Sequence, residues 1–183
     1  MNIETELTPN PETLKFIVGN EYIFQTNIEI KNEKEAKRFK FSKDFFELKG
    51  VQRIFIGENF VSVTKEKDVT WNYLKTKVLT FMLDYISSNK IIIEKQIKKK
   101  LLKKNKKNKI SNDIEKIIDE KVRPAVARDG GDIIFENFDK GIVYLTLKGA
   151  CAGCPSSTAT LKQGIENLLK HYFAEVKEVR ALN

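Results

Sequence analysis

The chain has 183 residues, of which 41% are hydrophobic and 10% aromatic, and its formal net charge is +8 at pH 7. This length allows one domain or two compact ones, and the apolar share is large enough for a core, which excludes wholesale disorder. No run approaches the roughly 18 consecutive apolar residues that a membrane helix needs, so a soluble protein without a membrane span is expected.

The N-terminal residues Met1 to Glu6 are acidic and lack an apolar core segment. They predict neither a secretory signal nor an Arg-rich transit peptide. We therefore expect a cytoplasmic protein, of bacterial type.

A lysine-rich segment divides the sequence. Residues 95–109 contain nine lysines in fifteen positions, and so many like charges with little apolar surface predict a linker rather than core. The predicted organisation is a domain at 1–90, a Lys-rich linker at 91–110 and a second domain at 111–183. A basic interaction protein that acts through this linker is one functional hypothesis, although a solvated charged linker is the simpler interpretation.

The first half predicts a small mixed domain of helices and antiparallel strands, without a recognisable catalytic constellation. Its expected elements are strands at 14–18, 51–56 and 60–64, with a hairpin turn at 57–59, and helices at 42–48 and 70–88, the second capped by Thr70.

The second half predicts the order α-β-β-α-β, so the fold class is α+β or α/β with two small mixed domains. Asn112 and Glu115 form a possible capping box for a helix that runs to Arg128 and is ended or bent by Pro124. The other expected elements are strands at 132–138, 142–147 and 176–182, a three-residue turn at 139–141 and a helix at 156–170.

The residues with distinctive chemistry lie in one loop, between the second strand and the second helix of this half. Cys151 and Cys154 form a Cys-x-x-Cys motif that can face one metal centre or form a disulfide. Because the loop runs into a helix N-terminus, we expect the thiolate form to be favoured over the thiol. Outside this loop, Asp129 and Asp132 are interpreted as a helix stop and turn, and His171 as an exposed residue at a helix end.

Four interpretations of the motif can be weighed. A thioredoxin-like dithiol is disfavoured because none of the four prolines lies downstream of the motif, where it could pack against the thiols. A zinc site needs two more ligands, and the single histidine, His171, lies about four turns along the helix. Two buried structural cysteines fit the polar, Gly-rich loop poorly, which leaves an iron–sulfur cluster as the favoured interpretation.

The number of cysteines in the chain limits how a cluster could be bound, and so concerns the oligomeric state. An iron–sulfur cluster takes four thiolates, whereas the chain has two cysteines. A two-fold homodimer would supply four, and exogenous thiols such as glutathione are the alternative. In either case the site suits delivery of a cluster better than long-term storage.

The second half also contains a long, ordered set of motifs: Val122-Arg123-Pro124, Arg128-Asp129-Gly130-Gly131-Asp132, Gly149 to Ser157, and Thr160 to Glu166. Through these residues it resembles the C-terminal NifU-type domain of the Nfu iron–sulfur carriers. Residues 7–88 are similar to the Nfu N-terminal domain, through Thr8 to Phe16, Gly50-Val51 and Phe55 to Lys65.

The resemblance implies a non-enzymatic scaffold that receives a [4Fe–4S] cluster, or a [2Fe–2S] cluster, from an upstream assembly scaffold and passes it to apo-proteins. It implies Cys151 and Cys154 as the cluster-binding and metal-ligating residues, and a homodimer when the cluster is bound. Nucleic-acid binding is not expected, since the linker lacks interleaved aromatic residues. The alternative function is a dithiol/disulfide oxidoreductase that uses the same two cysteines.

Overall fold

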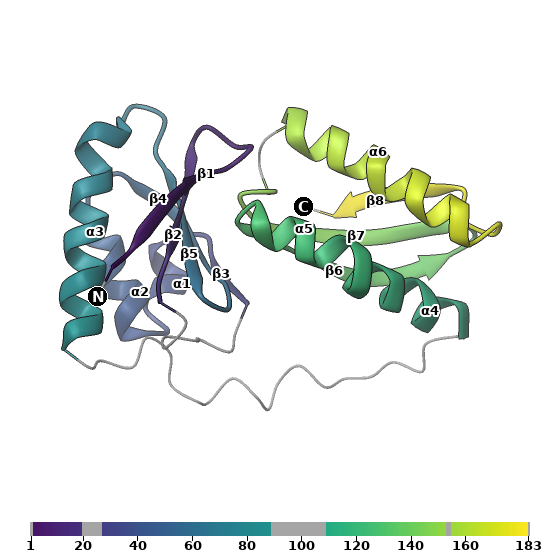
Figure 1. Ribbon diagram of the computed structural model, residues 1–183, viewed down its shortest axis with the longest axis horizontal. Coiled ribbons are helices and arrows are strands. Elements are labelled where there is room, and N and C mark those ends of the chain that lie inside the picture. Colours follow the sequence, from purple (N-terminus) through teal and green to yellow (C-terminus); the bar gives the residue numbers. More distant parts are fainter. Residues whose placement is uncertain (1, 20–26, 89–108, 153–154, 183) are drawn as a thin grey trace. The chain divides into compact units, whose positions relative to one another are not determined.

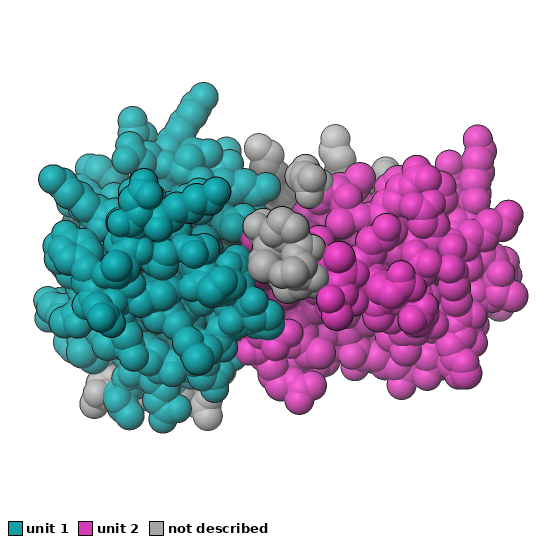
Figure 2. Space-filling view, turned by 90° about the horizontal axis from the view of Figure 1, so that it is seen from above, with its two compact units in different colours: residues 1–102 teal, residues 103–183 magenta. Residues whose placement is uncertain are grey.

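The computed structural model describes residues 2–19, 27–88, 109–152 and 155–182. The chain divides into two compact units, residues 1–102 and 103–183, which Figure 2 colours separately. Both units combine helices and strands, which confirms the predicted α+β class. Most of the predicted linker, residues 91–108, lies outside the described residues, whereas its last two residues already belong to a helix.

The N-terminal unit is built on a five-stranded antiparallel sheet with the order β1-β2-β5-β4-β3. The predicted hairpin is confirmed, because β4 and β5 pair directly across Gly57 to Asn59. The strands are β1 (Glu4–Leu7), β2 (Thr13–Ile17), β3 (Ile28–Ile30), β4 (Val51–Ile56) and β5 (Phe60–Lys65).

Three helices cover one face of this sheet: α1 (Glu33–Ala36), α2 (Lys40–Phe46) and α3 (Trp71–Ser87) (Figure 1). The predicted apolar stripe of the long helix is confirmed, since Leu74, Val78 and Met82 are fully buried. Thr70 precedes α3 as expected, but its side chain makes no capping hydrogen bond.

The C-terminal unit contains a three-stranded sheet with the order β6-β7-β8, in which β6 and β7 are antiparallel and β7 and β8 parallel. The predicted order α-β-β-α-β is confirmed, with two helical regions on one face of the sheet (Figure 1). The elements are α4 (Lys109–Ile117), the π-helical turn η2 (Ile118–Val122), α5 (Arg123–Arg128), β6 (Gly131–Asp139), β7 (Ile142–Gly149), α6 (Pro155–Tyr172) and β8 (Glu178–Leu182).

The first helical region differs from the prediction at Asn112, and it changes its helical geometry just before Pro124. Asn112 lies inside α4, which begins at Lys109, so the proposed capping box is wrong. Pro124 is the second residue of α5 and follows the wider π-helical turn. A proline has no N–H to donate and its ring collides with the carbonyl four residues earlier, and we attribute the local widening to this conflict.

The β6–β7 turn is tighter than expected. Asp139 pairs with Ile142, so only Lys140 and Gly141 form the loop, with φ angles of 49° and 86°. Two successive residues with positive φ are typical of a type I′ turn, whose twist matches that of the strands it joins. The predicted three-residue loop is therefore wrong, although Gly141 does adopt the left-handed conformation.

Candidate functional site

The candidate site lies where β7 ends and the chain turns toward α6. Gly149 is the last residue of β7 and has a φ of 65°, a conformation that glycine adopts without strain. Cys151 follows two residues later and belongs to the hydrophobic core of the C-terminal unit. Cys154, the second predicted ligand, lies outside the described residues and stays a prediction.

Three hydrogen bonds fix the backbone on both sides of Cys151. The Ala150 amide donates to the Gly130 carbonyl, and the Ala152 amide donates to the Gly149 carbonyl, each over 3.1 Å. The Thr158 hydroxyl, on the first turn of α6, donates to the Cys151 carbonyl over 3.1 Å. The loop around Cys151 is thus bonded both to the turn before β6 and to helix α6.

Gly131 provides the space in which the Cys151 side chain lies. In the register of the sheet it is opposite Gly149, next to the loop. A Cβ atom added at Gly131 would lie 2.5 Å from the Lys148 carbonyl oxygen and 2.9 Å from the Cys151 Sγ atom. Gly131 belongs to the Arg128 to Asp132 motif, which was the available signal in the sequence, but its contact with Cys151 is visible only in the structure.

Residue Cys151 is only 6% exposed. Burial raises its pKa to about 12, and the carboxylates of Asp129 and Asp132 add to this shift. The expectation that the helix N-terminus favours a thiolate is therefore wrong for Cys151, because desolvation penalises the charged form more strongly. A redox-active dithiol needs a cysteine with a lowered pKa, so the oxidoreductase alternative is not favoured.

Asp132 is not merely part of a turn, as the sequence suggested. It is buried in β6, and its Oδ1 atom lies 3.3 Å from Nε of Arg123 on α5. The Arg123 Nη2 atom also donates to the Ile133 carbonyl and lies near Asp119, each over 3.0 Å. These contacts join α5 to β6, the strand whose Gly131 lies against Cys151. Asp129 caps the end of α5 as predicted.

A second polar contact joins α6 to the edge strand β8. Glu166 accepts a hydrogen bond from the Val179 amide over 3.0 Å and from the Lys170 ammonium group over 2.6 Å. The bond from Lys170, followed by that from Val179, lowers the pKa of Glu166. His171 is exposed near the end of α6, as predicted.

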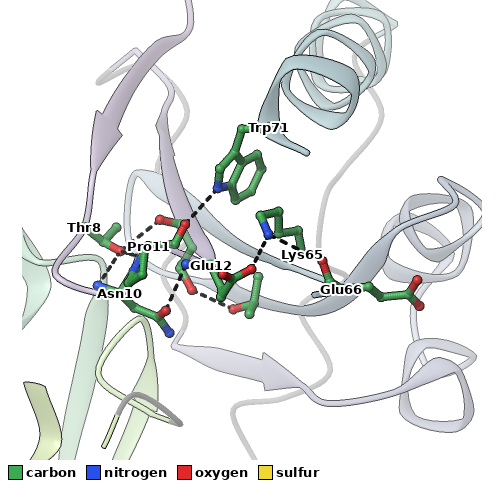
Figure 3. A network of polar contacts seen from close by, with 9 residues as sticks. Thr8, Asn10, Pro11, Glu12, Lys65, Glu66 and Trp71 are labelled. Carbon is green, nitrogen blue, oxygen red and sulfur yellow. Dashed lines mark hydrogen bonds and ion pairs between the residues drawn. The ribbon is translucent and has the colours of Figure 1, made fainter. Parts of the chain in front are cut away.

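The N-terminal unit contains a structural polar network rather than a site (Figure 3). Asn10 accepts a hydrogen bond from the Glu12 amide over 3.0 Å, and the Glu12 carboxylate pairs with Lys65. Trp71 packs at the margin of the core, and its Nε1 atom donates to the Pro11 carbonyl over 3.0 Å. In the parts of the chain that the structure describes, no three His, Cys, Asp or Glu side chains are grouped to hold a metal ion.

Comparison with known proteins assigns both units. The family model described as "NifU-like domain" matches residues 114–180, and the one described as "Scaffold protein Nfu/NifU N terminal" matches residues 3–89. The chain belongs to the Nfu/NifU family of iron–sulfur cluster scaffolds. The resemblance inferred from the motifs is thereby confirmed.

Two relatives show how far this similarity extends. NifU-like protein 4, mitochondrial, from Arabidopsis thaliana is 39% identical over 189 residues, which cover 98% of this chain and 65% of that protein. The human NFU1 iron-sulfur cluster scaffold homolog, mitochondrial, is 35% identical over 180 residues, which cover 98% of this chain and 71% of that protein. The chain thus spans about two thirds of the length of these relatives.

The names of these relatives also correct one prediction. Both are mitochondrial proteins of eukaryotes, so the expected bacterial, cytoplasmic location is wrong. The expected location was based on the composition of the first six residues, which carries little information about location. A separate prediction concerned the membrane: within the described residues, no helix has the length and apolar character needed to cross one.

Proposed function

We propose that this Nfu/NifU-family protein carries a [4Fe–4S] cluster as cargo and delivers it to apo-proteins, without catalysing a reaction of its own. Cys151 and Cys154 would hold the cargo. The observation that carries the proposal is the position of Cys151, in the turn that follows Gly149 at the end of β7, within the domain that matches the NifU family.

The number of thiols supports sharing of the cargo between two copies of the chain. Each copy contributes two cysteines, and a cluster of this kind takes four thiolates. Thiols from solution, such as glutathione, are the competing source of the missing pair. In both arrangements half of the ligands can leave together, which favours transfer of the cargo to a client.

The environment of Cys151 also favours a transferable cargo. A thiol must lose its proton when it binds iron, and burial makes this loss costly at Cys151. The released proton passes to solvent as the sulfur–iron bond forms. Part of the free energy of cluster binding therefore offsets the cost of deprotonating the thiol. The affinity of this site for the cluster is lower than that of a site whose cysteine is already a thiolate.

The test is anaerobic reconstitution of the apo-protein with iron and sulfide, followed by counts of both per chain. The wild-type protein should turn brown and bind about two iron and two sulfide ions per chain, one four-iron cluster per pair of chains. Cys151→Ala and Cys154→Ala should each abolish the colour while the far-UV spectrum is kept. A full complement of iron and sulfide in either variant would overturn the assignment of its cysteine.

A further inference from the structure

The hydrogen bond between Thr158 and Cys151 is separate from the bonds that build helix α6. Thr158 is in the first turn of α6, where a threonine hydroxyl inside a helix typically donates to the carbonyl three or four residues earlier. Its hydroxyl instead donates to the Cys151 carbonyl, seven residues earlier in the chain. The bond therefore acts on the cysteine loop.

A side-chain substitution can remove this contact, which is made by the Thr158 hydroxyl. The neighbouring bonds, from Ala150 and Ala152, are both made by backbone amides to backbone carbonyls. Thr158 is therefore the place at which the position of the cysteine can be tested without changing the cysteine or its neighbouring residues.

The Cys151 side chain points into the core in this conformation. It packs with the apolar residues of the C-terminal unit and against Gly131, and is 6% exposed. Iron cannot bind a sulfur in that position unless the sulfur leaves the core. If the Cys151 backbone stays fixed, the sulfur can leave the core by a rotation of the side chain alone. If the backbone is released, the loop must also become ordered again when the cargo binds, which costs conformational entropy.

We propose that Thr158 is a positioning residue for Cys151. By holding the Cys151 carbonyl, it keeps the thiol inside the core in the apo-protein and limits the change on cargo binding to the side chain. Loss of this bond therefore has two consequences. The thiol is exposed more often without cargo, and the bound cargo is lost sooner, because a less ordered loop holds it.

The first experiment uses the apo-protein and does not depend on the proposed function. In the full chain with Cys154→Ser, Cys151 is the remaining thiol, and its rate of alkylation by iodoacetamide is measured at one pH for the folded protein and for the protein unfolded in guanidinium chloride. We expect the folded protein to react at least about tenfold more slowly, as for a group exposed only by local opening. Thr158→Val should raise the folded rate about two- to tenfold, the range that one hydrogen bond supports.

Two variants separate the hydroxyl from packing. Thr158→Ser keeps the donor and should restore the slow rate, whereas Thr80→Val makes the same hydroxyl-to-methyl change on an exposed position of α3 and should leave the rate unchanged. A folded rate equal to the unfolded one would overturn the burial of the thiol. Equal rates for the wild-type and Thr158→Val chains, or no restoration by Thr158→Ser, would overturn the role of Thr158.

The second experiment rests on the proposed function, and uses chains that keep both cysteines. After reconstitution, the visible absorption of the cluster is followed in the presence of an iron chelator. Thr158→Val should lose its cluster about two- to tenfold faster than wild type, and Thr158→Ser at the wild-type rate. If the wild-type protein binds no cluster, the proposed function fails, while the alkylation result still decides the role of Thr158. If wild type and Thr158→Val both bind a cluster and lose it at equal rates, the proposed effect of Thr158 on retention of the cargo is overturned.

Discussion

At the scale of single residues, Gly131 and Gly164 provide a matched pair in the C-terminal unit. A methyl group at Gly131 would meet the Lys148 carbonyl oxygen at 2.5 Å, and that atom belongs to the backbone of the paired strand. At Gly164, in α6, a methyl group would meet nothing within 4 Å. The same substitution is therefore expected to have opposite effects at the two positions.

We expect Gly131→Ala to destabilise the C-terminal unit by about 1–3 kcal/mol through overpacking. Gly164→Ala should stabilise it by about 0.5–1 kcal/mol, because glycine is a poor residue in a helix interior. Amide hydrogen exchange in β6 and β7 measures the effect in this unit. The fluorescence of Trp71, the single tryptophan, reports on the N-terminal unit and serves as a control. An unchanged exchange rate in Gly131→Ala would contradict the packing argument.

At the scale of helices and strands, Glu166 joins α6 to β8 and should make the C-terminal unit sensitive to acid. Its pKa is lowered in the folded protein from the ordinary value of 4.5, so the carboxylate contributes stability above that pH. This contribution is lost as the pH falls from about 4.5 through the lowered folded pKa. We expect Glu166→Gln to be less stable than wild type at neutral pH, with a difference that shrinks on acidification.

The measurement is the urea midpoint of the C-terminal unit between pH 3 and pH 7, followed by amide exchange in α6 and β8. Glu136→Gln, which removes an exposed carboxylate from β6, is the control and should run parallel to wild type. A Glu166→Gln curve that also runs parallel to wild type over this range would contradict the role assigned to the ionised carboxylate.

The sequence predicted those elements whose pattern is strong and local. In β7, Val143, Leu145 and Leu147 alternate with half-buried residues, as expected for a strand with one face in the core. The short strands β1 and β3 were not predicted, because three or four residues contain too little periodicity and form through pairing with their neighbours.

The candidate site, too, could be predicted from the sequence only in part. Its motif identified Cys151, but the burial of the thiol depends on Gly131, twenty residues earlier, and on the apolar residues of distant helices. Likewise, the ion pair of Arg123 with Asp132 forms because a π-helical turn and a strand bring the two side chains together. Such contacts follow from tertiary packing, which a single sequence does not specify directly.

At the scale of the whole molecule, each unit has a hydrophobic core of its own. The N-terminal cluster includes Phe16, Phe45 and Leu74, and the C-terminal cluster includes Ile118, Leu145 and Leu169. Limited trypsin digestion within the Lys-rich residues 95–109 therefore cuts through neither core. The cysteine motif and helix α6 both lie on the C-terminal side of the cut.

We expect a fragment of about residues 110–183 to stay folded and to bind a cluster on reconstitution. Mass spectrometry identifies the cut, and far-UV circular dichroism with iron and sulfide counts tests the fragment. The intact chain treated in parallel is the control. An unfolded, colourless fragment would contradict the independence of the C-terminal unit.

The largest-scale expectation is that cluster content and dimerisation form one equilibrium. Two thiols per chain leave a four-iron cluster half-coordinated, so assembly recruits a second copy or thiols from solution. Under the proposed function the cargo binds the dimer and not the separate chains, and cargo binding would then stabilise the dimer by mass action. In thiol-free anaerobic buffer at micromolar concentration, the apo-protein should be monomeric and the loaded protein dimeric.

Sedimentation velocity of both forms measures this equilibrium, and an iron chelator should return the loaded protein to monomer. Dilution should speed the loss of colour, since dissociation of the dimer removes half of the ligands. The Cys151→Ala variant, taken through the same reconstitution, is the control and should stay monomeric. A loaded wild-type protein that remains monomeric with a complete four-iron cluster would mean that the missing ligands do not come from a second copy of this loop.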